Sequence, residues 1–210
     1  MFSQTSEKLY KLIDEIQQFG SDHTRVFGGK FQGGIRLQQS PIEFAKLINF
    51  LIEDGRAGCF YLEIGSAAGG TAFLIDHFLS PKLMVLIDDE SSPRCEHRPV
   101  ILKHVNRIEV ISDSHSQDTI EKVRMIGQKF DIIMFDGDHS YEGVKADFKN
   151  YNQFLNSNGL VLFHDICGKH EPLFEVSKFT EELISLYPEY KWICNFDEGG
   201  LGIGVYEKFI

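Results

Sequence analysis

The chain has 210 residues, of which 42% are hydrophobic and 25% are charged, and its formal net charge is −10. That length suits one domain with a single sizeable core. The acidic charge disfavours docking on phosphate backbones, and no run approaches the ~20 apolar residues that span a bilayer, so we expect neither nucleic acid nor a membrane as a partner.

The first residues and the cysteines of the sequence indicate a cytoplasmic protein. The first residues, MFSQTSEKLYKLIDEI, lack a basic region followed by an apolar core, so they are unlike a signal peptide. The cysteines are scattered without a C-x-x-C pair, which is typical of reduced thiols rather than of a disulfide frame. They are Cys59, Cys95, Cys167 and Cys194.

Helical and strand patterns alternate along the chain. The expected helices cover residues 2–19, 41–54, 71–79, 119–128, 143–155 and 171–187. The expected strands cover residues 59–64, 82–88, 107–112, 130–136, 160–164, 192–196 and 201–206. Asn158-Gly159 is expected to end the fifth helix, because such pairs often follow a helix C-terminus.

This alternation predicts an α/β fold with a mainly parallel sheet and helices on both of its faces. The short connection at residues 197–200 predicts that the last two strands form a C-terminal antiparallel hairpin. We expect a single domain over residues 1–210, in which residues 1–57 form an N-terminal helical extension or cap. Ligands of such open sheets bind at the carboxyl ends of the strands, so those ends are where a site is expected.

The stretch from Tyr61 to Thr71, YLEIGSAAGGT, combines a strand, a glycine turn and a helix start. This geometry brings bare backbone close to a nucleotide-like ligand. Its spacing, E-x-G-x-x-x-G-G, differs from the G-x-G-x-x-G of dinucleotide binders, which disfavours a dinucleotide-dependent oxidoreductase. A glycine turn of an ordinary α/β protein explains the stretch equally well, although it resembles the first motif of class I S-adenosylmethionine (SAM) methyltransferases.

Acidic residues follow five successive strands. Carboxylates gathered at one edge of a sheet repel one another unless a ligand, cation or donor set occupies them. Asp88 is placed to accept the ribose hydroxyls of a nucleoside and Asp113 its adenine amino group, while the turn at Gly65, Ser66 and Gly69 offers backbone N–H groups to a polar tail. Capping of the following helices is the competing explanation for such acids. The strand-end acids are Glu63, Asp88, Asp113, Asp136 and Asp165.

A second stretch, D-G-D-H-S-Y-E-G-V at residues 136–144, is followed by a strand that ends in His164-Asp165. Together they resemble a small-molecule O-methyltransferase group within the class I SAM enzymes, similar to methyltransferase family 24. The resemblance covers roughly residues 38–207. It implies a Rossmann-like, seven-stranded, mainly parallel sheet and SAM as the cofactor.

The resemblance also implies roles for individual residues. In metal-dependent relatives an Asp of this string binds a divalent cation, which matches Asp136, and its His is the general base, which matches His139. An acidic pair after the next strand completes the metal site; here that pair is His164 and Asp165. The sequence departs from the pattern because the first member is His rather than Glu or Asp, and an imidazole favours Mn²⁺, Fe²⁺ or Zn²⁺ besides Mg²⁺. A metal-free site, in which His164 only hydrogen-bonds the substrate, stays open.

These patterns predict a SAM-dependent O-methyltransferase that acts on a hydroxyl of a small molecule such as a sugar, a phenol or a natural product. The alternative is a nucleotide-binding α/β protein without catalysis, which the base beside the acids disfavours. Pairing of the N-terminal helix with a second copy of the chain, giving a homo-oligomer, is compatible with the sequence.

Overall fold

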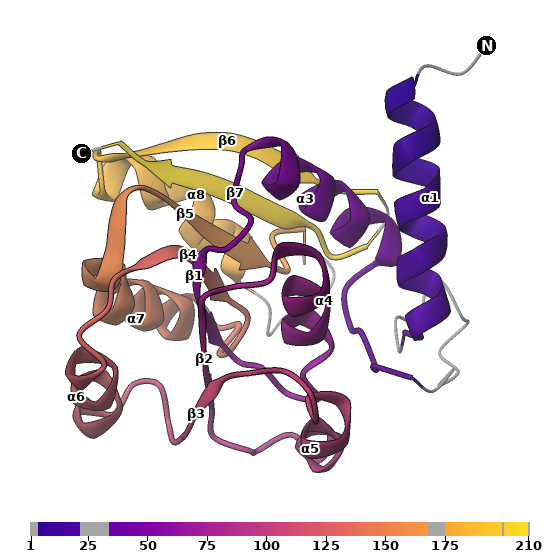
Figure 1. The fold of residues 1–210 in the computed structure, drawn as a ribbon. Coiled ribbons are helices and arrows are strands. Elements are labelled where there is room, and N and C mark those ends of the chain that lie inside the picture. The colour runs from indigo at the N-terminus through magenta and orange to yellow at the C-terminus, as the bar shows by residue number, and fades with distance from the viewer. Residues whose placement is uncertain (1–3, 22–33, 168–174, 199, 210) are drawn as a thin grey trace.

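The computed structural model describes residues 4–21, 34–167, 175–198 and 200–209 (Figure 1). The helices are α1 (Gln4–Phe19), α3 (Pro41–Glu53), α4 (Gly70–Leu79), α5 (Arg98–Ile101), α6 (Gln117–Met125), α7 (Tyr141–Tyr151) and α8 (Val176–Leu186). The strands are β1 (Phe60–Ile64), β2 (Leu83–Asp88), β3 (Ile108–Ile111), β4 (Phe130–Phe135), β5 (Leu155–His164), β6 (Tyr190–Phe196) and β7 (Ile203–Lys208). Of the helix expected from residue 171, residues 171–174 lie outside the described part.

The seven strands form one sheet in the order β3-β2-β1-β4-β5-β7-β6. The pairs among β3, β2, β1, β4 and β5 are parallel. β7 runs antiparallel to both β5 and β6, which closes the chain in a hairpin. The prediction of a mainly parallel sheet with a C-terminal antiparallel hairpin is therefore confirmed.

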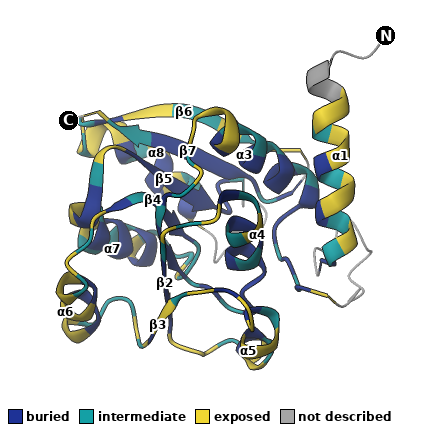
Figure 2. Cartoon of the chain, in the orientation of Figure 1, coloured by how far each residue is buried: buried dark blue, intermediate teal, exposed yellow. Residues whose placement is uncertain are grey.

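Helices cover both faces of the sheet, as expected. Side chains alternate between the faces along a strand, so Tyr61 joins one apolar cluster while Leu62 and Ile64 join the other. The first cluster contains residues of α1, α3 and α4. The second contains residues of α6, α7 and α8. Figure 2 shows the central strands buried between these two layers, which is why their sequences are almost wholly apolar.

The predicted end of the fifth helix was wrong. α7 ends at Tyr151, a short 3₁₀ turn at Asn152–Phe154 follows, and β5 already begins at Leu155. Asn158-Gly159 therefore lies inside the strand, where the pairing of β4 with β5 shifts register. Asn158 has a φ of 60°, so the pair that resembles a helix stop makes a bulge instead.

The sequence patterns also missed the helical segment between β2 and β3. A 3₁₀ turn at Pro93–His97 leads into α5. Ser92 starts it, because its hydroxyl accepts a hydrogen bond from the backbone N–H of Arg94 across 3.3 Å.

Among the residues that the structure describes, no helix has both the length and the apolar character needed to cross a bilayer.

Candidate active site

A cavity of about 820 Å³ opens at the carboxyl ends of the parallel strands. It lies where the strand order reverses between β1 and β4, the place where open α/β sheets bind ligands. The ends of β1 to β5 all contribute to its wall, so the structure brings most of the predicted site residues into one space. Those that line it are Gly65, Ser66, Gly69, Asp88, Asp113, Asp136, His139, His164 and Asp165.

The glycine turn after β1 is required by the fold itself. Gly65 has a φ of 85°, and a Cβ atom there would lie 2.1 Å from the backbone oxygen of Asp136. Gly69, the residue before α4, has a φ of 86°. Only glycine adopts such conformations without strain, and the lack of side chains leaves backbone exposed to the cavity.

Asp88 is held in place by groups of the protein. Its Oδ2 accepts from the backbone N–H of Ala67 across 2.7 Å, and its Oδ1 accepts from that of Glu90 across 2.8 Å. The guanidinium of Arg98 lies 3.7 Å from Oδ1, and the same group donates to the hydroxyl of Ser66 across 2.8 Å. Arg98 is only 1% exposed, so a buried cation ties the turn after β1 to the end of β2.

Glu63 and Asp113 differ from the other predicted site residues in how far they are exposed. Glu63 is not among the described residues that line the cavity. It is buried beneath the turn, where burial raises its pKa to about 8 and the hydroxyl of Tyr61 donates to it across 2.7 Å. Asp113 lines the cavity with a side chain that is 65% exposed, and it accepts from the backbone N–H of His115 across 2.9 Å.

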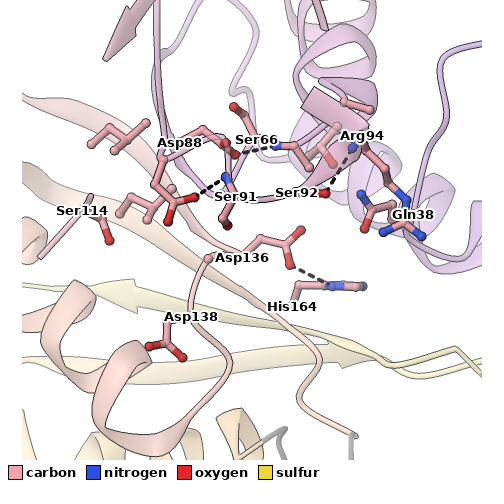
Figure 3. A pocket seen from close by; sticks show the side chains of 18 of the residues that line it. Gln38, Ser66, Asp88, Ser91, Ser92, Arg94, Ser114, Asp136, Asp138 and His164 are labelled. Atoms are coloured by element: carbon pink, nitrogen blue, oxygen red, sulfur yellow. Dashed lines mark hydrogen bonds and ion pairs between the residues drawn. The ribbon is translucent and has the colours of Figure 1, made fainter. Parts of the chain in front are cut away.

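Two carboxylates and two imidazoles meet on one side of the cavity. The Nδ1 atom of His164 lies 3.1 Å from Oδ1 of Asp136 and 3.2 Å from Oδ1 of Asp165. The Nε2 atom of His139 lies 2.8 Å from Oδ2 of Asp165 and 3.3 Å from Oδ1 of Asp136. Figure 3 shows Asp136 and His164 facing each other. One potential ligand atom from each residue lies within 4.8 Å of the others, so the cluster could hold a metal ion.

The charges of this cluster are strongly interdependent. Burial opposes a charge on His139, yet the carboxylates of Asp136 and Asp165 outweigh it and raise its pKa to about 9. Burial likewise opposes a charge on His164, and the same carboxylates raise its pKa above the ordinary value. Burial favours neutral carboxyl groups, but the two imidazoles lower the pKa of both Asp136 and Asp165.

Gln39, which the sequence patterns did not single out, completes the surroundings of Asp136. Its side-chain amide donates to Oδ2 of Asp136 across 2.7 Å, and its Oε1 accepts from the hydroxyl of Thr71 across 2.8 Å. Gln39 precedes α3 and is 1% exposed. The segment before α3 therefore forms part of the site.

A family model described as a methyltransferase domain matches residues 62–166, half of the 210 residues. The chain belongs to this methyltransferase family. The matched residues run from β1 to the turn after β5 and thus contain the glycine turn. They also contain the acid–imidazole cluster, which consists of Asp136, His139, His164 and Asp165.

Other comparisons match one sequence relative and several solved structures with the same fold. Protein y4gI of Sinorhizobium fredii, described as uncharacterized, is 31% identical over 110 residues, which are 46% of this chain but only 12% of that protein. The O-methyltransferase TomG from Streptomyces achromogenes, solved with SAM, has a TM-score of 0.63, 16% identity and full coverage of both chains. MycE, a methyltransferase of the mycinamycin pathway solved with Mg, S-adenosylhomocysteine (SAH) and mycinamycin VI, has a TM-score of 0.63 and 15% identity over 94% of this chain and 54% of MycE. At these identities the likeness to solved structures establishes the fold.

Part of the D-G-D-H-S-Y-E-G-V string forms the turn before α7 and the N-terminal cap of that helix. The carboxylate of Asp138 accepts from the backbone N–H of Ser140 across 2.9 Å, and the Ser140 hydroxyl accepts from that of Gly143 across 3.1 Å. A Cβ atom at Gly143 would lie 2.1 Å from the Asp138 carboxyl carbon. These residues start α7 and fix the loop, so Asp136 and His139 are the members of the string that belong to the acid–imidazole cluster.

Proposed function

We propose that this methyltransferase transfers the methyl group of SAM to a hydroxyl oxygen of a small molecule. The observation that carries the proposal is the single cavity of about 820 Å³ that joins the glycine turn and Asp88 to the acid–imidazole cluster. That volume lies in the range of small-molecule sites and suits a nucleoside cofactor together with an acceptor. SAM in TomG and SAH in MycE, which share the fold, favour the same cofactor here.

The cofactor would lie along the strand ends. Asp88 would accept the ribose hydroxyls, and Asp113 the adenine amino group. The backbone of Gly65, Ser66 and Gly69 would receive the amino-acid tail. Glu63, beneath this turn, would support the end of β1 rather than touch the cofactor, since Tyr61 already occupies its carboxylate.

His139 would act as the general base. Its side chain is 26% exposed, compared with 14% for Asp136 and 5% each for His164 and Asp165, so it is the member of the cluster that an acceptor reaches most easily. The imidazole takes the proton of the acceptor hydroxyl. The oxygen then forms a bond to the methyl carbon as the carbon–sulfur bond breaks, leaving a methyl ether and SAH. Much of the rate would come from holding the oxygen in line with that bond.

Asp136, His164 and Asp165 fit a divalent cation. Oδ1 of Asp165 is buried and has no hydrogen-bond partner among the described residues, and it lies beside the Nδ1 atom of His164. A bound cation would lower the pKa of the acceptor hydroxyl and orient it. The carboxylates of Asp136 and Asp165 raise the pKa of His139 to about 9, which favours the protonated imidazole at neutral pH. A cation bound to the same carboxylates would offset their negative charge and lower that pKa. A bound cation would therefore help His139 to act as a base.

Calorimetric titration with SAM and with NAD, followed by measurement of SAH release, tests the proposed function. We expect SAM to bind, NAD not to bind, and SAH to form with at least one member of a panel of hydroxylated sugars, phenols and natural products. Absence of SAM binding would contradict the proposal. SAM binding without SAH formation from any acceptor would instead favour a non-catalytic nucleotide-binding protein.

A further inference from the structure

We propose that the cation site formed by Asp136, His164 and Asp165 selects a transition-metal ion of the Mn²⁺, Fe²⁺, Co²⁺ or Zn²⁺ type over Mg²⁺. This inference builds on the proposed function, because it names the ion that would assist the same reaction. It depends on the imidazole that this chain places at position 164, where the resemblance implies an acid.

The spacing of the three side chains is that of ligands around one ion. Nδ1 of His164 lies 3.1 Å from Oδ1 of Asp136 and 3.2 Å from Oδ1 of Asp165. Two donor atoms that each lie about 2.1 Å from an ion, at roughly right angles, are about 3 Å apart. One nitrogen and two carboxylate oxygens thus converge at the separation expected for a shared ion.

Buried atoms without partners point to the same place. The side chains of His164 and Asp165 are each 5% exposed. Two of their buried atoms have no hydrogen-bond partner among the described residues: Nε2 of His164, and Oδ1 of Asp165, which forms only the 3.2 Å ion pair with Nδ1 of His164. Buried polar atoms are normally hydrogen-bonded, so these two atoms leave the cluster able to take a further partner such as a cation.

The donor set disfavours the oxygen-binding ions. Gln39 donates to Oδ2 of Asp136 across 2.7 Å, which leaves Oδ1 to face His164. Asp136 therefore offers a single oxygen. Ca²⁺ requires six to eight oxygen ligands, and Mg²⁺ is bound by carboxylate, phosphate and water oxygens rather than by imidazole. An imidazole nitrogen suits Zn²⁺, Fe²⁺ and related ions, whose affinities for mixed nitrogen and oxygen sites are also higher.

The competing explanation is an ion-paired cluster without metal, in which the Nδ1–H group of His164 donates a hydrogen bond shared between the two carboxylates. The distances alone fit both arrangements, so the decision rests on binding. Chelator-treated protein is titrated calorimetrically with CoCl₂, MnCl₂ and MgCl₂, each alone, and the visible absorption of the Co²⁺ form is recorded. The same measurements are made on His164→Asp and on the matched control His104→Asp, an exposed histidine outside the cavity.

We expect wild-type protein to bind Co²⁺ and Mn²⁺ more tightly than Mg²⁺, and His164→Asp to lower the ratio of Co²⁺ to Mg²⁺ affinity by at least about tenfold. The Co²⁺ absorption should change in the same variant, and His104→Asp should behave as wild type. Equal or tighter binding of Mg²⁺ by the wild type, or no binding of any of the three ions, would overturn the inference. An unchanged ratio of Co²⁺ to Mg²⁺ affinity in a folded His164→Asp protein would also overturn it, since the preference would then not come from the imidazole. If that variant does not fold, the three wild-type titrations still test the preference for a transition-metal ion.

The inference and the proposed function fail in different ways. If no transition ion binds, SAM titration and SAH release still report whether the chain transfers methyl groups. If Co²⁺ binds but SAM does not, the proposed metal site is supported and the proposed methyl transfer is contradicted.

Discussion

The side-chain amide of Gln39 donates a hydrogen bond to the carboxylate of Asp136 across 2.7 Å, although the two residues are 97 positions apart. Gln39 is in turn fixed by the hydroxyl of Thr71 at the start of α4. The segment before α3 therefore determines which oxygen of Asp136 faces the imidazoles of the cluster.

Replacing Gln39 with Leu should lower methyl transfer and divalent-ion affinity by about 10–100-fold, the usual effect of losing a group that orients a metal ligand. SAM affinity should fall less than turnover, because Gln39 contacts the cluster directly and reaches the end of the glycine-turn stretch only through the hydroxyl of Thr71. Kinetic measurement of SAH release, with calorimetric titration of SAM and MnCl₂, checks this. Gln153→Leu, which alters an exposed glutamine, is the control. Wild-type turnover in Gln39→Leu would contradict an orienting role.

Gly65→Ala should destabilise the protein far more than Gly127→Ala. Both glycines have a positive φ, 85° and 70°, so alanine at either position is strained by roughly 1–2 kcal/mol. At Gly65 the added Cβ atom would also lie 2.1 Å from a backbone oxygen, whereas at Gly127 nothing lies within 4 Å. Urea unfolding compares the two variants. Equal losses of unfolding free energy would show that β1 and β4 are not in this close contact.

Arg98→Met should cost about 3–5 kcal/mol of unfolding free energy, because it leaves the buried carboxylate of Asp88 without its cation. Arg98 is 1% exposed and donates to Glu90 across 2.9 Å and to Ser66 across 2.8 Å. The control, Arg124→Met, removes an exposed ion pair with Glu121 and should cost less than about 1 kcal/mol. SAM affinity should also fall in Arg98→Met alone. Equal stability of the two variants would contradict a stabilising role for the buried contacts of Arg98 with Asp88 and Ser66.

His115 should make stability depend on pH. The carboxylate of Asp147, 3.3 Å away, raises the pKa of His115 from 6.5 to about 9, with Asp113 contributing. The folded state thus binds this proton more tightly than the unfolded state. Its stabilisation is fully present below pH 6.5 and is lost as the pH rises through about 9. Urea unfolding from pH 6 to 10 should show this decline in the wild type and in His104→Gln but a weaker one in His115→Gln; identical slopes would contradict the pairing.

The sheet could be predicted because β2 and β4 are apolar on both faces and the carboxyl ends of parallel strands must meet at one edge. That same rule brought Asp136, His164 and Asp165 together. The start of β5 was missed because Asn158-Gly159 forms a bulge as readily as it ends a helix. Gln39 and Arg98 could not be found, since a contact across the fold leaves no period or spacing in the sequence.

The most direct test of a proton acceptor beside the cofactor is SAH production by His139→Ala, measured together with its affinity for SAM. We expect SAM to bind within about twofold of the wild-type affinity while turnover falls by about 10²–10⁴-fold, the usual contribution of a general base. Unchanged turnover would contradict the role of His139, and loss of SAM binding would contradict its placement on the acceptor side of the cavity.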